Sequence, residues 1–254
     1  MKRLSFLTIL FFANQIQAES PMHVLKHYES FYEAIHPAAE NNDEAYAWFS
    51  DIPHPLFNAV MHLSVPNPAE KIEALIEKAP AGNPISFWVH SENRTERMVD
   101  ILQEKGFAPI VTCPLMSWAV ESVSMQEVDI RPAERAVFNQ ISSEAFHFDP
   151  VTKEKYGNLL AQLDAEKFLI FWEDVPVGTG ILFASGEVGG IFNIAVLPEY
   201  YGKGLAKAMT RYLMKRAKEL GLKQVVLLSS PDVETLYSSL GFKKIMDIKI
   251  YIHK

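Results

Sequence analysis

The sequence predicts an α/β (α+β) fold made of two successive units, each a mixed β-sheet flanked by helices. Two observations favour this class. Short apolar runs of strand length alternate along the chain with apolar residues at helical spacing. A helix followed by Gly-Phe and a strand also occurs twice, with the Gly-Phe pair at residues 106–107 and at residues 241–242. Aligning these pairs also aligns the helices before them, so the first unit is interpreted as a degenerate copy of the second.

The first unit is expected to cover residues 22–124. Apolar residues at helical spacing predict its first helix: Val24, Leu25, Tyr28, Phe31, Tyr32 and Ile35. Strands are expected at residues 46–49, 57–63, 85–89 and 115–120, and further helices after Pro68 and at residues 93–105. In the strand at residues 57–63, apolar and polar positions partly alternate, which is typical of a strand with one buried face. The polar stretch 121–127 marks the predicted boundary.

The second unit is expected to cover residues 125–254. Its strands are predicted at residues 128–131, 168–172, 177–183, 187–197, 225–229 and 243–252. Its helices are predicted at residues 134–146, 152–163, 203–220 and 232–240. This unit carries both of the motifs that point to chemistry.

The first motif is a strand, a proline, a glycine loop and a helix in direct succession. Residues 191–197 are apolar, and Pro198 ends the strand because proline cannot donate to a ladder. Gly202 and Gly204 permit backbone angles and a close ligand approach that other residues do not. The helix begins directly after them, and free amides at a helix start form an anion site. A plain glycine turn is the alternative interpretation.

The ordered run resembles the acetyl-coenzyme A loop of the GNAT superfamily of N-acetyltransferases. That loop reads Arg or Gln, two residues, Gly, one residue, then Gly or Ala. Gly204 and Ala206 fill the last two places, whereas Tyr201 replaces the Arg or Gln. The resemblance implies acetyl-coenzyme A as co-substrate, bound by residues of the strand and loop: Ile194, Ala195, Val196, Tyr201, Gly202, Lys203, Gly204, Leu205 and Ala206.

The second motif covers residues 236–242 and matches the Leu-Tyr-x-x-x-Gly-Phe signature of the same family. By this resemblance Tyr237 is the general acid that protonates the leaving thiolate, a role that a phenol can perform. The alternative is that Tyr237 is a packed helix aromatic. In the first unit Leu102 falls on the position of Tyr237, and Pro66 and Pro68 occupy the loop position. Since proline has no N–H to offer a phosphate, we expect one coenzyme per chain.

The predicted function is N-acetyltransfer from acetyl-coenzyme A to an amine of a small molecule or peptide by direct transfer. The base is left open: Asn193 is a poor base and Glu187 lies far along the strand, so a water relay is preferred. His147 and Asp149 fall in a turn that covers the acceptor in the family, or are ordinary polar loop residues. The alternative function is a non-catalytic acyl-coenzyme A binding or sensing module.

Composition narrows the choice of partners. The net charge of −7 argues against a general nucleic-acid binder, whose phosphate contacts need a basic surface. The histidines are scattered without metal-ligand spacing, so no metal is predicted, and the single cysteine, Cys113, excludes an internal disulfide. Nothing in the sequence indicates the oligomeric state.

The N-terminus gives a conflicting indication. Residues 1–18 have the charged, apolar and polar regions of a secretory signal, with an apolar run too short for a stable membrane span. Acetyl-coenzyme A is a cytosolic metabolite, and a plausible helix begins near Met22. A cytoplasmic location with an upstream extension or unused signal is therefore preferred, with export as the alternative.

Overall fold

The computed structural model describes residues 20–93, 97–124 and 128–253. The signal-like residues 1–18 and part of the predicted boundary, residues 125–127, lie outside this range. No helix in the described ranges is long and apolar enough to cross a membrane.

The strands are β1 Glu40–Asn41, β2 Ala45–Phe49, β3 Asn58–Leu63, β4 Ser86–Val89, β5 Phe107–Ala119, β6 Ile130–Pro132, β7 Glu166–Trp172, β8 Val175–Ser185, β9 Val188–Val196, β10 Gln224–Leu228 and β11 Lys243–His253. The α-helices are α1 Pro21–Glu33, α2 Pro68–Lys78, α3 Met98–Glu104, α4 Arg135–Ala145, α5 Pro150–Gln162, α6 Leu205–Glu219 and α7 Glu234–Ser238. Short 3-10 turns are η1 Pro55–Phe57, η2 Pro198–Tyr200 and η3 Pro231–Val233.

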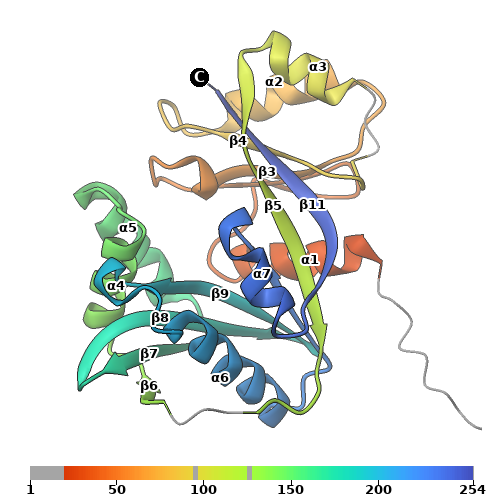
Figure 1. Cartoon of the computed structure of the whole chain (residues 1–254). Helices are drawn as coiled ribbons and strands as arrows, with labels where there is room; N and C mark the ends of the chain where they lie inside the picture. The colour runs from red at the N-terminus through yellow and green to blue at the C-terminus, as the bar shows by residue number, and fades with distance from the viewer. Residues whose placement is uncertain (1–19, 94–96, 125–127, 254) are drawn as a thin grey trace, which may run out of the picture.

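All described strands form one mixed sheet in the order β1-β2-β3-β4-β11-β5-β10-β9-β8-β7-β6. The α/β class and the two successive units are confirmed, but their strands join into one continuous sheet. The last strand of each half lies within the sheet of the other half: β11 pairs with β4 and β5, and β5 pairs with β11 and β10. Figure 1 shows β5 and β11 running side by side between the two halves.

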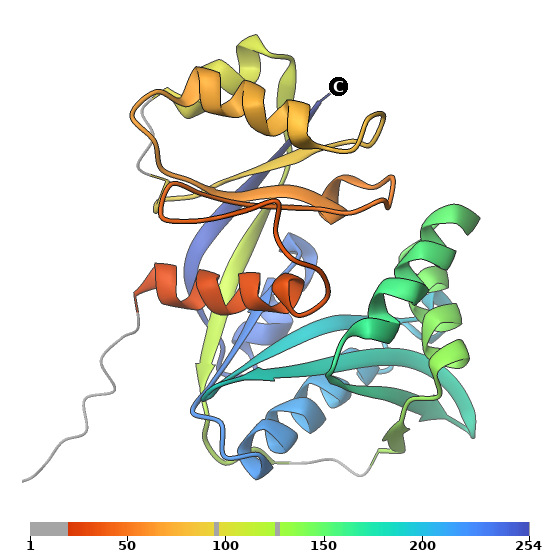
Figure 2. The ribbon, with the colours of Figure 1, turned by 180° about the vertical axis from the view of Figure 1, so that it is seen from behind.

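Helix α1 packs between the halves (Figure 2). The predicted apolar face is buried, and Phe31 stacks on Phe192 of β9 with ring centroids 3.7 Å apart. Ser20 caps the helix by accepting a hydrogen bond from the His23 N–H, and Pro21 occupies the first turn, where its missing N–H costs nothing. One aromatic cluster thus spans residues from both halves of the chain.

Two helical layers cover the part of the sheet that belongs to the second half. Helices α6 and α7 contribute to one apolar cluster, together with residues of β7 to β10. Helices α4 and α5 contribute to a different cluster, which they share with α1. Residues that alternate along β9 divide between these clusters, with Ile191 in the first and Phe192 in the second. The sheet therefore separates a face covered by α6 and α7 from a face covered by α1, α4 and α5.

The half-polar alternation expected at residues 57–63 does not describe the environment of β3. All six residues of β3 are buried, including Asn58 and His62. Asn58 is satisfied there because its side-chain amide donates to the carbonyl of Ile52 at 2.8 Å. Asn58 is thus a buried hydrogen-bonding residue, which periodicity alone does not distinguish from a solvent-facing one.

We expect a fragment of residues 125–254 to lack an independent cooperative fold. Both sheet neighbours of β11 belong to the first half, and β10 loses β5, so long strand edges are left unpaired. The measurement is circular dichroism with a thermal melt of the fragment, compared with the whole chain. Mixing it during refolding with a separate fragment of residues 20–124 should restore the native spectrum. A fragment that melts cooperatively alone as a monomer would contradict the exchanged topology.

Candidate active site

The candidate site begins where two parallel strands diverge. β9 and β10 pair at three positions: Val188 with Gln224, Gly189 with Val225 and Gly190 with Val226. β9 continues to Val196 and β10 to Leu228 without further pairing between them. Over residues 191–196, β9 is therefore paired only with β8, and its other edge faces an opening in the sheet.

A bulge at Asn193 shapes this opening. The β8–β9 register shifts between Thr179 and Ile181, and Asn193 has φ +55°, a left-handed conformation that asparagine tolerates. The Thr179 hydroxyl lies within hydrogen-bond distance of the Asn193 carbonyl (3.0 Å) and the Asn193 Oδ1 (2.8 Å). The Asn193 Nδ2 donates to the Ser142 hydroxyl at 2.9 Å and to the Tyr156 hydroxyl. The amide nitrogen of Asn193 has no basic lone pair, so this side chain cannot act as the base. Its hydrogen bonds hold the bulge in place.

The strand residues predicted to bind coenzyme differ in where their peptide groups point. The N–H of Leu197 donates to the Val177 carbonyl of β8 at 2.8 Å. Because peptide groups alternate along a strand, those of Ala195 also face β8, whereas those of Val196 face the opening. By the same alternation, the peptide groups of Ile194, two residues before Val196, also face the opening. The geometry thus favours Ile194 and Val196 over Ala195 for main-chain contacts.

The glycine loop leaves a run of amides without partners. Gly202 and Gly204 have φ +75° and +76°, and Gly204 is the N-cap of α6 without a capping side chain. The first main-chain bond of this helix is donated by Ala208 to the Gly204 carbonyl at 3.0 Å. Within the described residues, the N–H groups of residues 202–207 donate no hydrogen bond. Such a cluster at a helix start suits a pyrophosphate.

The side chains of this loop play a minor part. Tyr201, which replaces the expected Arg or Gln, is 62% exposed. The Lys203 ammonium lies 4.5 Å from the Trp172 ring centroid, a cation–π contact that ties the loop to β7. The predicted anion site is therefore expected to depend on main-chain donors.

Tyr237 lies on α7, at the face of the sheet covered by α6. It is 8% exposed and packs edge-on against Phe242, with centroids 5.9 Å apart. The same apolar cluster contains Val196 and Leu205, and Ile194 packs against it. Burial raises the pKa of Tyr237 to about 12, so the phenol is protonated near neutral pH and able to donate. The fold thus brings Tyr237 to the same face as the predicted coenzyme residues.

Comparison with known proteins identifies this part of the chain. A sequence model of the acetyltransferase (GNAT) family matches residues 134–242. Residues 134–242 form a GNAT acetyltransferase domain. A curated relative, the uncharacterized N-acetyltransferase ycf52-like of Prochlorococcus marinus, is 36% identical to this chain over 52 residues. That match covers 20% of this chain and 29% of the relative, so it spans less than a third of the relative's length.

Solved structures extend the likeness in fold beyond the GNAT domain. A GCN5-related N-acetyltransferase from Kribbella flavida has a TM-score of 0.64 at 15% identity, covering 89% of this chain and 94% of its own. A GCN5-related N-acetyltransferase from Sphaerobacter thermophilus has a TM-score of 0.61 at 15% identity, covering 82% and 75%. A GNAT-family acetyltransferase from Colwellia psychrerythraea has a TM-score of 0.54 at 12% identity, covering 93% and 98%. The likeness in fold to these structures therefore extends over the first half of the chain as well.

The first half has a similar opening, but its own side chains bond to the exposed strand edge. β3 and β4 pair in parallel at only two positions, Ala59 with Ser86 and Val60 with Phe87. Beyond them the His90 Nε2–H donates to the Met61 carbonyl at 3.0 Å, and the Asn93 amide donates to the Leu63 carbonyl at 3.3 Å.

Two further features keep His90 in this role. Burial lowers its pKa to about 4, so the ring is neutral, and its Nδ1 accepts from the Glu92 N–H at 3.2 Å. The other nitrogen must then carry the proton that it donates to Met61. The sequence predicted Pro66 and Pro68 at this junction. It did not predict the role of His90 and Asn93, because the spacing of these two residues does not show which strand edge they contact.

An aromatic pocket of about 300 Å³ lies on the other face of the GNAT sheet. We define this pocket by its lining residues: Tyr28, Phe31, Tyr32, Ile35, Trp48, His54, Leu56, Phe57, Phe146, Phe148, Tyr156, Leu159, Leu160, Phe192 and Asn193. They come from α1, β2 and η1 of the first half, and from α5, the α4–α5 turn and β9 of the second. The pocket therefore reaches the β9 bulge at the edge of the opening.

The turn between α4 and α5 contributes to the pocket, though through other residues than those predicted. His147 is exposed and has φ +55°, while its neighbours Phe146 and Phe148 line the pocket. Asp149 caps α5: its carboxylate accepts from the Thr152 hydroxyl and from the N–H groups of Thr152 and Val151, which holds its pKa below the usual range. These two polar residues thus have the structural role that was the alternative interpretation.

Glu187 lies at the far end of β9 from the bulge. It is exposed, and its carbonyl accepts from the Lys223 N–H at 2.7 Å. In the described ranges, no group of three His, Cys, Asp or Glu side chains is placed to hold a metal ion. β9 itself, Val188–Val196, contains no aspartate or glutamate, so no side chain of this strand is a candidate for the base.

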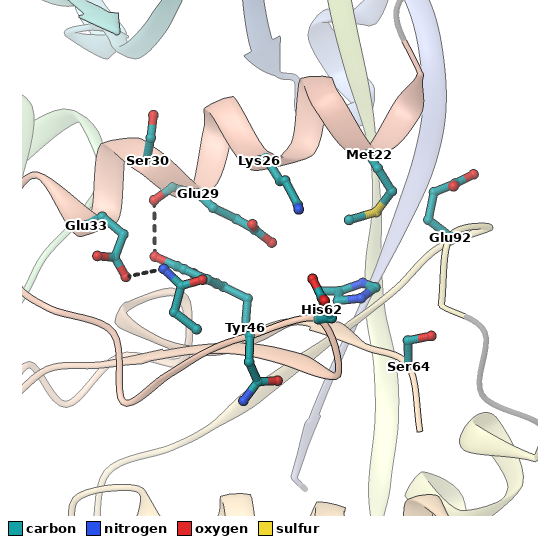
Figure 3. Close-up of a pocket in the computed structure, with 12 residues that line it drawn as sticks. Met22, Lys26, Glu29, Ser30, Glu33, Tyr46, His62, Ser64 and Glu92 are labelled. Atoms are coloured by element: carbon teal, nitrogen blue, oxygen red, sulfur yellow. Dashed lines mark hydrogen bonds between the residues drawn. The ribbon is translucent and has the colours of Figure 1, made fainter. Parts of the chain in front are cut away.

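A larger cavity of about 580 Å³ lies on the polar side of α1, away from the GNAT opening. Figure 3 shows Lys26, Glu29 and Glu33 projecting from α1 toward Tyr46 and His62. Burial raises the pKa of Glu29 to about 8. This cavity is lined by no residue of β9, β10, α6 or α7, so it does not reach the strand edge where the thioester would lie. The smaller aromatic pocket is the one that includes the Asn193 bulge.

A substitution at Gly204 tests the loop. Gly204→Val forces a branched side chain into a left-handed conformation and places it over the free amides. We expect the affinity for acetyl-coenzyme A to fall by about 10- to 100-fold, consistent with the loss of roughly two charge-assisted hydrogen bonds. Isothermal titration calorimetry measures this affinity.

The matched control for this variant is Gly82→Val. Gly82 has φ +82° and, like Gly204, no heavy atom within 4 Å of an added Cβ. Both variants should therefore lose a similar free energy of unfolding, about 1–3 kcal/mol for a strained backbone. Gly82→Val should keep the coenzyme affinity. Equal affinities for both variants would show that the loop is only a turn.

Proposed function

We propose that this protein transfers an acetyl group from acetyl-coenzyme A directly to a primary amine. Membership of the GNAT acetyltransferase family implies acyl transfer from an acyl-coenzyme A. The observation that carries the more specific proposal is the arrangement around the β9–β10 opening. Free loop amides and the free β9 edge lead from the start of α6 toward the Asn193 bulge, and Tyr237 belongs to the same apolar cluster as Val196 and Leu205.

The coenzyme would be held mainly by main-chain groups. Its pyrophosphate would lie on the N–H groups of residues 202–207, where the dipole of α6 also favours negative charge. Its pantetheine arm would extend the sheet along β9 through the peptide groups of Val196 and Ile194. This placement directs the thioester toward the bulge, with the thioester sulfur near Tyr237.

In the transfer step the neutral amine attacks the thioester carbonyl carbon. A C–N bond forms, the C–S bond breaks, and the electron pair of that bond leaves on sulfur. One proton from the amine must be lost and one proton must reach the thiolate. Tyr237 donates to the developing thiolate, and the amine proton is removed through water, because Asn193 has no basic lone pair.

The high pKa of Tyr237 decides how far the proton moves. A thiol has a pKa of about 8.5, so complete transfer from a phenol with a pKa of about 12 is uphill. The difference corresponds to roughly 5 kcal/mol at 1.36 kcal/mol per pKa unit. Tyr237 therefore acts best as a hydrogen-bond donor that gives up its proton only as the amine proton becomes available to replace it.

The second candidate function is a non-catalytic acyl-coenzyme A sensor. It is favoured by one observation: no carboxylate lines the aromatic pocket beside the bulge. A sensor would bind acetyl-coenzyme A and release no thiol with any amine. Thiol release in the presence of a panel of amines distinguishes the two functions.

Tyr237→Phe tests the acid. We expect kcat to fall by about 10- to 1000-fold, within the range for a general acid, while coenzyme affinity is unchanged. The control is Tyr212→Phe, which removes a hydroxyl from the same face, where the Tyr212 ring packs against Phe168 at 4.9 Å. This control should keep its turnover. Wild-type kcat in Tyr237→Phe, measured where chemistry limits the rate, would remove Tyr237 from the mechanism.

A further inference from the structure

We propose that the acceptor is a small primary amine whose remaining part is uncharged and aromatic, held in the aromatic pocket. This inference rests on the proposed acetyl transfer and specifies its acceptor. The pocket reaches the Asn193 bulge from the face of the sheet covered by α1, α4 and α5. Tyr237 and the glycine loop belong to the opposite face. Coenzyme and acceptor would therefore approach from opposite faces and meet at the opening between β9 and β10.

Rings from both halves form the wall of the pocket. The Phe57 ring of η1 lies 5.4 Å from Tyr156 of α5 and 6.0 Å from Phe148, in tilted and edge-on geometry. Phe148 in turn packs edge-on against Tyr156 at 5.2 Å. Such offset and edge-on arrangements are the ones in which a further aromatic ring gains stability from its neighbours. The first half, which has its own opening occupied by side chains, thus supplies much of the acceptor wall.

The pocket offers no charge of either sign. Among its lining residues there is no aspartate, glutamate, lysine or arginine. His54 is neutral near pH 7 because burial lowers its pKa, and its Nδ1 accepts from the Leu56 N–H at 3.3 Å. Burial also raises the pKa values of Tyr28 and Tyr156, which keeps both phenols neutral.

An unpaired charge on the acceptor would therefore be buried without compensation. Transfer of an ionised carboxylate or ammonium into such surroundings is strongly unfavourable unless it is paired. This disfavours polyamines, which carry a second ammonium, and free amino acids, which carry a carboxylate. The reacting amine itself is neutral when it attacks, so it is not excluded by the same argument.

The size of the pocket fits a ring with a short arm. A dry apolar cavity of about 150 Å³ is sufficient for benzene. At about 300 Å³, this pocket has room for a substituted ring and a two-carbon chain that carries the amine. Among the residues that line the pocket, Tyr156 and Asn193 supply the polar groups at the bulge, where the amine would react.

Matched acceptors test the inference in the whole chain. Thiol release from acetyl-coenzyme A is measured with 2-phenylethylamine, phenylalaninamide, phenylalanine and putrescine. We expect kcat/KM for 2-phenylethylamine and phenylalaninamide to exceed that for phenylalanine and putrescine by at least about 100-fold, since an unpaired buried charge is strongly penalised. Phenylalanine and its amide share the ring and differ in one carboxylate, so their ratio isolates the charge.

A pair of variants reports on the position of the acceptor. Leu56 lines the pocket at its rim and is 38% exposed, so it tolerates a polar side chain. Leu56→Glu should raise kcat/KM for putrescine by about 10-fold or more, because the new carboxylate pairs with the second ammonium. Leu56→Gln, with the same shape and no charge, should leave putrescine as poor as in the wild type.

The outcomes separate this inference from the proposed function. Thiol release that is as fast with putrescine or phenylalanine as with 2-phenylethylamine overturns the aromatic acceptor and leaves acetyl transfer intact. An unchanged preference in Leu56→Glu overturns the placement of the acceptor in this pocket. Thiol release with none of these four amines overturns the inference, and the absence of thiol release across the wider amine panel, in a protein that binds acetyl-coenzyme A, overturns the proposed function with it.

Discussion

The ladder between β5 and β11 is the constraint on which the rest of the structure depends. Each strand is the last of its half, and each lies within the sheet of the other half. The exchange makes β5 the antiparallel neighbour of β10, so the strand on one side of the opening is held in place by the first half of the chain. It also fixes α1 over β9, where Phe31 stacks on Phe192 and the acceptor wall begins. One continuous sheet thus positions the face proposed for the coenzyme and the face proposed for the acceptor.

The two openings in this sheet show how one fold supports different roles. In the first half, His90 and Asn93 bond to the β3 edge, and prolines remove main-chain donors at the junction. In the second half, the edge near Val196 and the amides of residues 202–207 have no partner in the described residues. An unsatisfied polar group is stabilised when a ligand supplies the missing bonds, so only the second opening is suited to a coenzyme. The first half instead contributes residues that line the aromatic pocket.

Much of the fold, including the junction of strand, loop and helix at which the coenzyme site is proposed, could be predicted from the sequence, because local signals determine it. Pro198, Gly202 and Gly204 mark the junction of strand, loop and helix, and periodicity marks α1 and α6. The strand exchange could not be predicted, because no feature of the sequence of β5 or β11 indicates which strands pair with it. The aromatic pocket was missed for a similar reason. Its rings belong to segments that are far apart in the sequence. In the α4–α5 turn the polar residues His147 and Asp149 were predicted to contribute, whereas their neighbours Phe146 and Phe148 line the pocket.

The central claim is that one opening of the sheet binds coenzyme and the other is occupied by the protein's own side chains. A calorimetric titration of the whole chain with acetyl-coenzyme A, followed by a crystal structure of the complex, tests it most directly. The account predicts one molecule per chain, with its pyrophosphate on the amides of residues 202–207 and its thioester near Asn193. Two equivalent sites per chain, or coenzyme lying against residues 66–68, would contradict it.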